Sequence, residues 1–204
     1  MADKAMTFVL ASASPRRLAL LEQIGRKPDL IAPMDVDEAA HAGESPGHLA
    51  ARLAAEKAAA AAGLHPGAVI LAADTVVACG LRELPKTEDP AVARKYLAFL
   101  SGRRHRVYGG IAVRAPDGKL WQRTVVTMVK LARIEDAEIE AYLATGEWKG
   151  KAGAYGIQGA AGAFIKDING SYTNIVGLCI YTARGLLMAA EAHAAKRAMA
   201  SPST

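Results

Sequence analysis

The sequence predicts an α/β domain built around a mixed β-sheet, and three features of the chain support this. Short apolar runs typical of buried strands alternate with stretches whose apolar residues recur at helical spacing. Several helical stretches begin at Ser-Pro or Asp-Pro and end near glycine, as capped helices do. No linker divides the chain, so we expect one domain over residues 7–197, with disordered ends at 1–6 and 198–204.

The elements of the N-terminal half follow from apolar spacing and from caps. A strand over 7–11 is expected to lead into a helix over 14–24, which has Ser14 at its N-cap. A second helix is expected to begin at Ser45 and to stop at Gly63.

The remaining elements are predicted in the same way. Residues 68–78, AVILAADTVVA, predict one or two buried strands broken by Asp74. Beyond them we expect a helix over 89–102, strands over 107–113 and 120–131 joined by a PDGK turn, a helix near 135–145, a glycine-rich stretch over 146–177 and a last helix over 182–197.

Composition limits the classes of function. The 204 residues are 51% hydrophobic, which is enough to bury a substantial core, and the net charge of +5 favours anionic partners such as phosphates, nucleotides or nucleic acid. Cys79 and Cys179 lie in no Cys/His cluster, so we expect two reduced core cysteines and no zinc site. Neither a signal peptide nor an apolar run of membrane-spanning length is present, so we expect a cytoplasmic protein without a membrane partner.

The stretch ASASPRRLALLEQIG raises a question, because Arg16 and Arg17 fall in the first turn of a helix. The helix dipole disfavours cations there by roughly 0.3–1 kcal/mol each. A serine-rich turn holding Ser12 and Ser14, followed by a helix N-terminus, forms an anion site if a polyanion binds, and arginine binds phosphate bidentately. The alternative is that both arginine side chains turn away and pair with surface acids.

Two further charged residues interrupt apolar patterns. Asp74 lies where an apolar strand would continue, and a buried carboxylate there needs a partner, a proton or a metal ion, although a loop-capping aspartate is a common alternative. Lys57 shares one helical stripe with Leu49 and Leu53, so it needs an anionic partner unless it snorkels to water. Lys86, in the loop LPKTEDP, has no local feature that separates it from a solvated lysine.

The glycine-rich stretch matches neither a Walker A loop nor GxGxxG. It predicts either a loop whose backbone can approach a ligand, with Lys149, Lys151 and Gln158 as its polar groups, or a set of tight turns between short strands. The basic cluster SGRRHRV over 101–107 lacks interleaved aromatic residues, so we expect a solvated loop and no nucleic-acid partner.

Taken together, these segments resemble the Maf family of nucleoside triphosphate pyrophosphatases over about residues 7 to 190. The resemblance depends on LASASPRRLALLEQIG, VDE, AAEKA, AADTVV, LSGRRHRVYGGIAV and KAGAYGIQGAAGAFI, which occur in the order and at the spacing of that family. It implies a two-lobed Maf/ITPase-like α/β fold with a mixed twisted sheet and a central cleft. It also implies hydrolysis between the α- and β-phosphates of a nucleoside triphosphate, with a divalent cation (Mg²⁺ or Mn²⁺) as cofactor.

The resemblance also assigns roles to residues of this chain. Asp74 corresponds to the proposed general base and is a candidate metal contact, as is Glu38. Lys57 and Lys86 correspond to the catalytic lysines, although LPK stands here in place of the usual Gly-Lys-Pro.

Three positions separate the branches of the family by substrate. Arg16, Thr75 and Gln158 match the branch that prefers dTTP and UTP, whereas the 7-methyl-GTP branch has Trp, Gln and Glu there. We therefore expect Arg16 and Arg17 to face the triphosphate, Gln158 to contact a pyrimidine edge and Thr75 to shape the same pocket.

Two other functions remain open from the sequence. One is a basic, non-catalytic regulator that binds nucleic acid or a protein partner in division control, and the other is the same hydrolysis acting on a modified purine triphosphate. A homodimer is expected only by analogy with similar folds.

Overall fold

The structure, a computed structural model, describes residues 6–200 and contains a seven-stranded mixed sheet with helices packed around it. The strands are β1 (Phe8–Ala11), β2 (Leu30–Ile31), β3 (Val69–Cys79), β4 (Arg82–Glu83), β5 (Arg104–Arg114), β6 (Leu120–Leu131) and β7 (Ile165–Asn169). Their order is β2-β1-β3-β5-β6-β7, with β4 paired to β3. β1 runs parallel to β2 and β3, and the other pairs are antiparallel, which confirms the predicted mixed sheet.

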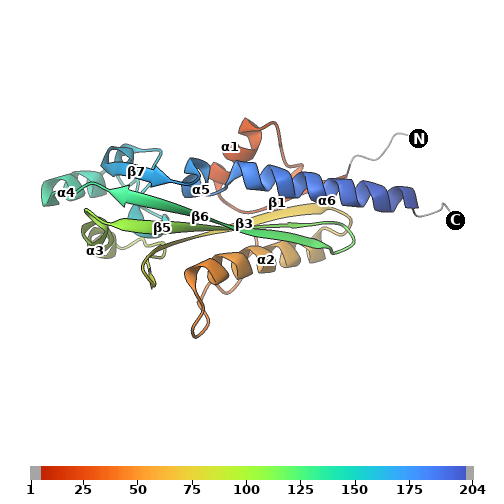
Figure 1. The fold of residues 1–204 in the computed structure, drawn as a ribbon, viewed down its shortest axis with the longest axis horizontal. Coiled ribbons are helices and arrows are strands. Elements are labelled where there is room, and N and C mark those ends of the chain that lie inside the picture. The colour runs from red at the N-terminus through yellow and green to blue at the C-terminus, as the bar shows by residue number, and fades with distance from the viewer. Residues whose placement is uncertain (1–5, 201–204) are drawn as a thin grey trace.

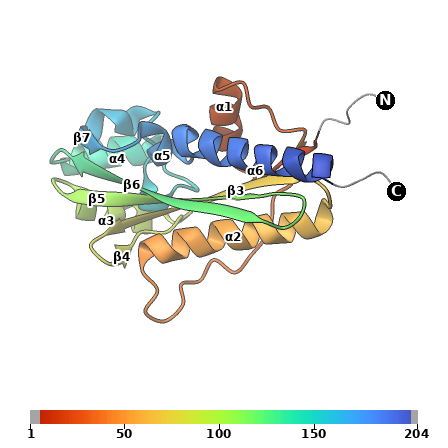
Figure 2. The ribbon, with the colours of Figure 1, turned by 45° about the vertical axis from the view of Figure 1, so that its right-hand side comes forward.

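The helices form two groups along the long strands β5 and β6. They are α1 (Pro15–Gln23), α2 (Pro46–Leu64), α3 (Pro90–Leu100), α4 (Asp136–Ala144), α5 (Tyr172–Val176) and α6 (Ile180–Ala200). At one end of the molecule α2 covers one face of the sheet and α6 lies across the other, with α1 beside it, while α3 and α4 lie at the opposite end (Figure 1). Figure 2 shows the same division after rotation, so the fold is two-lobed as expected.

Small residues bring α2 unusually close to the sheet. Ala54, Ala58 and Ala61 are fully buried against the strands. Gly110 on β5 faces the α2 backbone, and a Cβ atom built there would lie 1.9 Å from the carbonyl oxygen of Ala50. This close approach sets the distance from α2 to β3 and hence the position of Lys57 on α2.

The predicted helix starts at Ser14, Ser45 and Asp89 are confirmed by the structure, whereas the last helix begins at Ile180 and not at 182. Ser45 and Asp89 accept hydrogen bonds from the backbone N–H groups of His48 and Ala91. Ser14 is the N-cap of α1 as predicted, but its side chain makes no capping hydrogen bond. Its hydroxyl group therefore remains outside the helix hydrogen bonding.

Several predicted boundaries were wrong. β3 runs without a break through Asp74, because residues 70–78 are paired continuously with β5. Gly63 does not stop α2, which continues to Leu64. Residues 104–106 are not a solvated loop but the start of β5, and His105 in this segment is buried.

The two ends of the chain were predicted to be disordered beyond residues 7 and 197. The last helix extends to Ala200 instead of ending at 197. Disorder was predicted at 1–6 and 198–204; residues 198–200 are helical, whereas 1–5 and 201–204 lie outside the described residues. The division into one domain with two tails stays a prediction. Within residues 6–200, no helix is both long and apolar enough to cross a bilayer.

The glycine-rich stretch is not a set of turns between short strands, because it contains one strand only, and the predicted approach of its backbone to a ligand stays a prediction. It folds into two short 3-10 helices, η1 (Ala152–Ala154) and η2 (Ala160–Phe164), followed by β7 and α5. Gly153 has φ +74°, a left-handed conformation that favours glycine, and its N–H donates to the carbonyl group of Leu84 over 2.7 Å. These turns tie the stretch to the loop after β4.

Candidate active site

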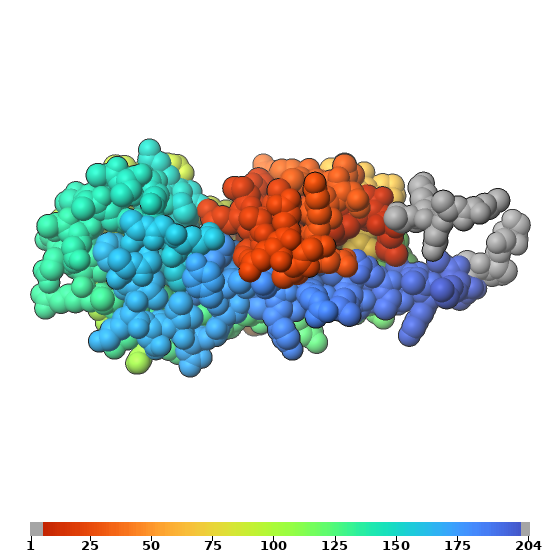
Figure 3. Space-filling view, turned by 90° about the horizontal axis from the view of Figure 1, so that it is seen from above, coloured from red at the N-terminus to blue at the C-terminus, as the bar shows by residue number. Residues whose placement is uncertain are grey.

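A cavity of about 580 Å³ opens beside the centre of β3. β1 stops at Ala11, opposite Ala72, and β4 pairs only with the last two residues of β3, so β3 has no strand partner on that edge over residues 73–77. The cavity lies along this stretch, between the turn that precedes α1 and the segments 150–159 and 175–177. In Figure 3 the red N-terminal segment lies against the blue C-terminal part of the chain on one face of the molecule.

A buried lysine joins two carboxylates at one side of the cavity. Lys57 Nζ donates to Asp74 Oδ1 and to Glu38 Oε1, each over 2.6 Å. Lys57 and Asp74 are only 7% and 6% exposed, whereas the Glu38 side chain is half exposed. Lys57 therefore does not snorkel to water, and its predicted need for an anionic partner is confirmed.

The charges in this cluster stabilise one another. Burial alone would lower the pKa of Lys57, but the charge of Asp74 and the hydrogen bonds to both carboxylates raise it above its ordinary value. Burial alone would raise the pKa of Glu38, but its contacts with Lys57 and the charge of Lys86 lower it. At neutral pH Lys57 is therefore a cation and Glu38 a carboxylate.

Asp74 lies behind Lys57 and not on the cavity wall. The cavity is lined by Lys57, Glu38 and Thr75, while Asp74 points to the other face of β3, toward α2. The loop-capping alternative for Asp74 was wrong, since Asp74 is paired in register with Gly110 in the middle of the sheet. It is the neighbouring strand β1 that ends there, just before the level of Asp74.

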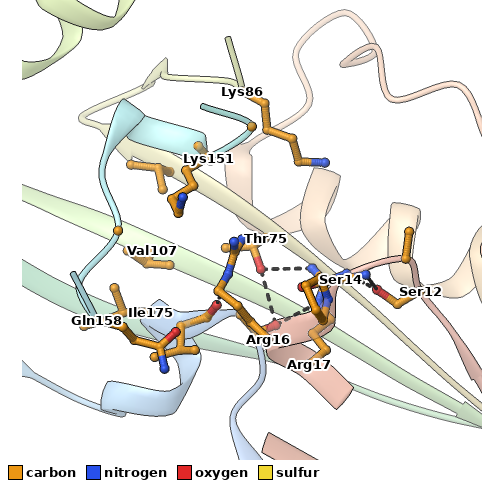
Figure 4. A pocket seen from close by; sticks show the side chains of 18 of the residues that line it. Ser12, Ser14, Arg16, Arg17, Thr75, Lys86, Val107, Lys151, Gln158 and Ile175 are labelled. Carbon is orange, nitrogen blue, oxygen red and sulfur yellow. Dashed lines mark hydrogen bonds between the residues drawn. The ribbon is translucent and has the colours of Figure 1, made fainter. Parts of the chain in front are cut away.

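The two arginines at the start of α1 point into the cavity and make different contacts. Arg17 donates from Nε to the carbonyl group of Gly177 over 2.9 Å, from Nη1 to Ser12 Oγ over 2.9 Å and from Nη2 to Thr75 Oγ1 over 3.2 Å. Arg16 donates from Nε to the carbonyl group of Val176 over 3.2 Å. Figure 4 shows Arg17 between Ser12 and Thr75.

These contacts decide between the two sequence-based interpretations of the arginines. Among residues 6–200, neither Arg16 nor Arg17 forms a salt bridge with a carboxylate, so pairing with surface acids was the wrong alternative. Within the same residues no hydrogen bond from the Nη atoms of Arg16 is found, whereas the Arg17 guanidinium is held on three sides. Burial, followed by the nearby charge of Arg16, lowers the pKa of Arg17 below its ordinary value.

The other predicted binding residues also reach this cavity. Ser12, Ser14, Thr75, Lys86 and Gln158 all line it. Lys86 Nζ is 3.6 Å from Glu38 Oε2, so the LPK loop does bring this lysine to the carboxylate cluster. Figure 4 shows Gln158 and Ser12 at opposite ends of the cavity, an arrangement that suits an elongated ligand.

Two residues of the cavity wall, Glu147 and Tyr155, were not among the predicted site residues. Glu147 lines the cavity and accepts a hydrogen bond from the backbone N–H of Ala160 over 2.8 Å. Tyr155 also lines it, and its hydroxyl group lies 2.7 Å from Nε2 of the buried His105. No local pattern marks these residues, because their partners are distant in the sequence.

Lys151, a polar residue of the glycine-rich stretch, lines the same cavity. Its pKa is lowered by burial and by the charge of Arg16. Together with Arg16, Arg17 and Lys86, it places four basic side chains around one space, which is a setting for a strongly anionic ligand.

Glu38 and Asp74 supply too few oxygen atoms to bind Mg²⁺ by themselves, but they could bind it together with a phosphate ligand. Among residues 6–200, no three His, Cys, Asp or Glu side chains are grouped as a metal site of protein ligands alone would require. Glu38 and Asp74 are two carboxylates held by one lysine, and Mg²⁺ is commonly bound by one or two carboxylates plus substrate phosphates and water. The donor set therefore suits a hard cation that arrives with a phosphate ligand.

The mixed sheet, the buried lysine-carboxylate cluster and the basic cavity together define an α/β protein with a polyanion site. Residues 7–190 match the Maf-like protein family, and the chain belongs to that family.

Named relatives cover most of the chain. A dTTP/UTP pyrophosphatase of Paramagnetospirillum magneticum is 59% identical over 180 residues, which are 88% of this chain and 95% of that protein. A dTTP/UTP pyrophosphatase of Hyphomonas neptunium is 58% identical over 180 residues, 88% of this chain and 93% of that protein. A solved nucleoside-triphosphatase (dITP/XTP pyrophosphatase) of Mycobacterium abscessus has a TM-score of 0.47 and 18% identity, covering 93% of this chain and 98% of that one.

Proposed function

We propose that this chain is a nucleoside triphosphate pyrophosphatase that cleaves dTTP and UTP between the α- and β-phosphates. The observation that carries the proposal is the joint placement of the Lys57 cluster and the paired arginines around one cavity. The names of the relatives that are more than half identical to this chain support the substrate class. The same three residues that match the pyrimidine branch, Arg16, Thr75 and Gln158, all line the cavity.

The basic side chains of the cavity are proposed to bind the triphosphate. Arg16 has free Nη donors on the cavity side and would contact phosphate oxygens, with Lys86 and Lys151 adding positive charge. Arg17, held by Ser12 and Thr75, would keep the turn before α1 in place and add its charge to the site. Gln158, at the far end of the cavity, is positioned to contact the base.

The carboxylate cluster is proposed to serve the attacking water. A bound Mg²⁺ or Mn²⁺ would neutralise phosphate charge and lower the pKa of a coordinated water, and Glu38 and Asp74 would hold it. Water adds at phosphorus while the bridging P–O bond breaks, so the monophosphate and pyrophosphate leave. Lys57 occupies Asp74 Oδ1, so Asp74 would act from behind Lys57, with Oδ2 either accepting the proton from water or contacting the cation.

Location and assembly belong to the same proposal. The free thiols of Cys79 and Cys179 agree with a reducing, cytoplasmic setting. A homodimer and the absence of a nucleic-acid partner stay predictions.

The decisive experiment measures pyrophosphate release from a panel of nucleoside triphosphates with Mg²⁺ or Mn²⁺. We expect release from dTTP and UTP, and we expect Asp74→Asn to reduce it by about 100-fold or more, since general acid–base groups contribute roughly 10²–10⁴-fold. Asp117→Asn, which removes a surface carboxylate paired with His193 away from the cavity, is the matched control and should keep full activity.

Other outcomes would contradict the proposal in different ways. Turnover of a methylated purine triphosphate alone would keep the reaction and refute the assigned roles of Arg16, Thr75 and Gln158. No metal-dependent turnover of any nucleotide by the folded protein would refute the enzyme itself.

A further inference from the structure

Asn174 is a fully buried polar residue that belongs to neither the predicted site nor the cavity wall. It lies in the middle of the short helix α5 and is 0% exposed. Its Nδ2 group lies 3.1 Å from the carbonyl oxygen of Val107, 3.2 Å from that of Val125 and 3.1 Å from Thr127 Oγ1. One side chain thus joins α5 to both β5 and β6.

The sheet has a notch that fits this side chain. A Cβ atom built on Gly109 of β5 would lie 1.9 Å from Asn174 Oδ1, so only glycine leaves room for the amide. Among the described residues Asn174 Oδ1 has no hydrogen-bond partner, so the side chain is held through its Nδ2 group alone. Thr127 completes the attachment, since its Oγ1 accepts from the Ser171 N–H and donates to the Ser171 carbonyl group.

The chain that leaves this anchor contacts both arginines of the cavity. The carbonyl group of Val176 accepts from Arg16 Nε and that of Gly177 accepts from Arg17 Nε. These two carbonyl groups follow Asn174 by two and three residues, so the position of Asn174 in its notch fixes where they lie. Gly177 has φ +139°, a conformation that favours glycine, and this rotation lies between the two carbonyl groups.

We propose that Asn174 is a positioning residue for the phosphate-binding arginines. By anchoring α5 in the Gly109 notch, it presents two adjacent carbonyl groups that hold the Nε atoms of Arg16 and Arg17. Each guanidinium is thereby fixed on its Nε side, and the Nη atoms of Arg16 are directed to the ligand. The functional part of this inference rests on the proposed pyrophosphatase activity, whereas its structural part does not.

The test combines kinetics with a direct readout of the arginines. In Asn174→Ala we expect KM for dTTP or UTP to rise by about 10- to 100-fold, which is the order of loss when a hydrogen bond that holds a charged group is broken. The kcat value should change much less, because the arginines bind phosphate before as well as during the reaction. A merely structural role would lower the amount of active enzyme, and so the apparent kcat, at constant KM.

Nuclear magnetic resonance of the arginine Nε–H groups tests the same inference without turnover. Hydrogen exchange at Arg16 and Arg17 Nε should become about 10-fold or more faster in the variant, as expected on losing a charge-assisted hydrogen bond. Gly109→Ala fills the notch with a Cβ atom and keeps every hydrogen-bonding group of Asn174. It is the second test variant, to be used if Asn174→Ala does not fold. Gly63→Ala, with nothing within 4 Å of the added Cβ, is the control for both measurements.

The outcomes are distinct. Unchanged Nε–H exchange and unchanged KM in both notch variants would overturn the inference. If no nucleotide is turned over by the wild-type protein, the proposed function fails, and the exchange measurement alone still decides whether Asn174 holds the arginines.

Discussion

Acidification should destabilise this protein through His105, which is buried in β5 with only 2% of its surface exposed. Burial lowers the pKa of this imidazole from 6.5 to about 4. The unfolded chain therefore binds a proton at a higher pH than the folded protein does. Stability from the neutral imidazole is fully present above pH 6.5 and is lost as the pH falls from there toward 4.

The size of the effect follows from the pKa difference. One pKa unit corresponds to 1.36 kcal/mol, so the free energy of unfolding should fall by roughly 3 kcal/mol in total, at about 1.4 kcal/mol per pH unit. This is a large share of the roughly 5–15 kcal/mol by which a domain is typically stable. Carboxylates whose pKa values are lowered in the folded state, such as Glu38, add a further loss at lower pH, so the histidine must be isolated by comparison.

The assay is urea denaturation of the wild type and His105→Gln at several pH values between 7.5 and 4. The free energy of unfolding of the wild type should fall by about 3 kcal/mol relative to that of His105→Gln as the pH goes from 7.5 to 4, since the carboxylates are common to both proteins. Tyr155→Phe removes the hydroxyl group near Nε2 but leaves the ring buried, and it should keep the wild-type dependence because burial is the cause. A difference that is constant from pH 7.5 to 4 would refute a buried neutral His105.

Two further predictions concern the packing that builds the site. Lys57→Met leaves the buried carboxylate of Asp74 without its cation, so we expect urea denaturation to show a free energy of unfolding lower by about 3–5 kcal/mol. The double variant Lys57→Met/Asp74→Asn should recover part of this loss, because the unpaired charge is removed as well. Equal stability of Lys57→Met and the wild type would contradict a buried ion pair. Gly110→Ala places a Cβ atom 1.9 Å from the Ala50 carbonyl oxygen, so we expect the free energy of unfolding to fall by about 1–3 kcal/mol and pyrophosphate release to fall as well. Gly63→Ala, where the added Cβ meets nothing within 4 Å, is the control for both measurements. A fully active Gly110→Ala protein would contradict the inference that this close contact sets the position of α2.

Local signals predicted the elements of this fold well. Ser14-Pro15, Ser45-Pro46 and Asp89-Pro90 all mark true helix starts, because capping depends on residues that are neighbours in the sequence. The break predicted at Asp74 was wrong because the partner of this residue is distant in the sequence. A buried carboxylate is tolerated inside β3 because Lys57, from a different element, reaches it.

The candidate site could be predicted only in part for the same physical reason. The predicted residues are those whose type is unusual for their position, such as a lysine on an apolar stripe or arginines in a first turn. Asn174 and His105 lie where no local pattern is violated, and their roles depend on contacts with Val107, Val125 and Tyr155. Such contacts arise only once the sheet and the glycine-rich stretch have come together.

The structure changes the explanation of the two arginines at the start of α1. Their position costs roughly 0.3–1 kcal/mol each against the helix dipole. Hydrogen bonds to charged groups contribute about 1.5–3 kcal/mol each, and Arg17 makes three, to Gly177, Ser12 and Thr75. These bonds offset the cost of the helix position and part of the cost of burying the guanidinium, since burial lowers the pKa of Arg17. Arg16 makes a single such bond, to Val176, and lines the cavity, so its placement agrees with the phosphate-binding role proposed for it.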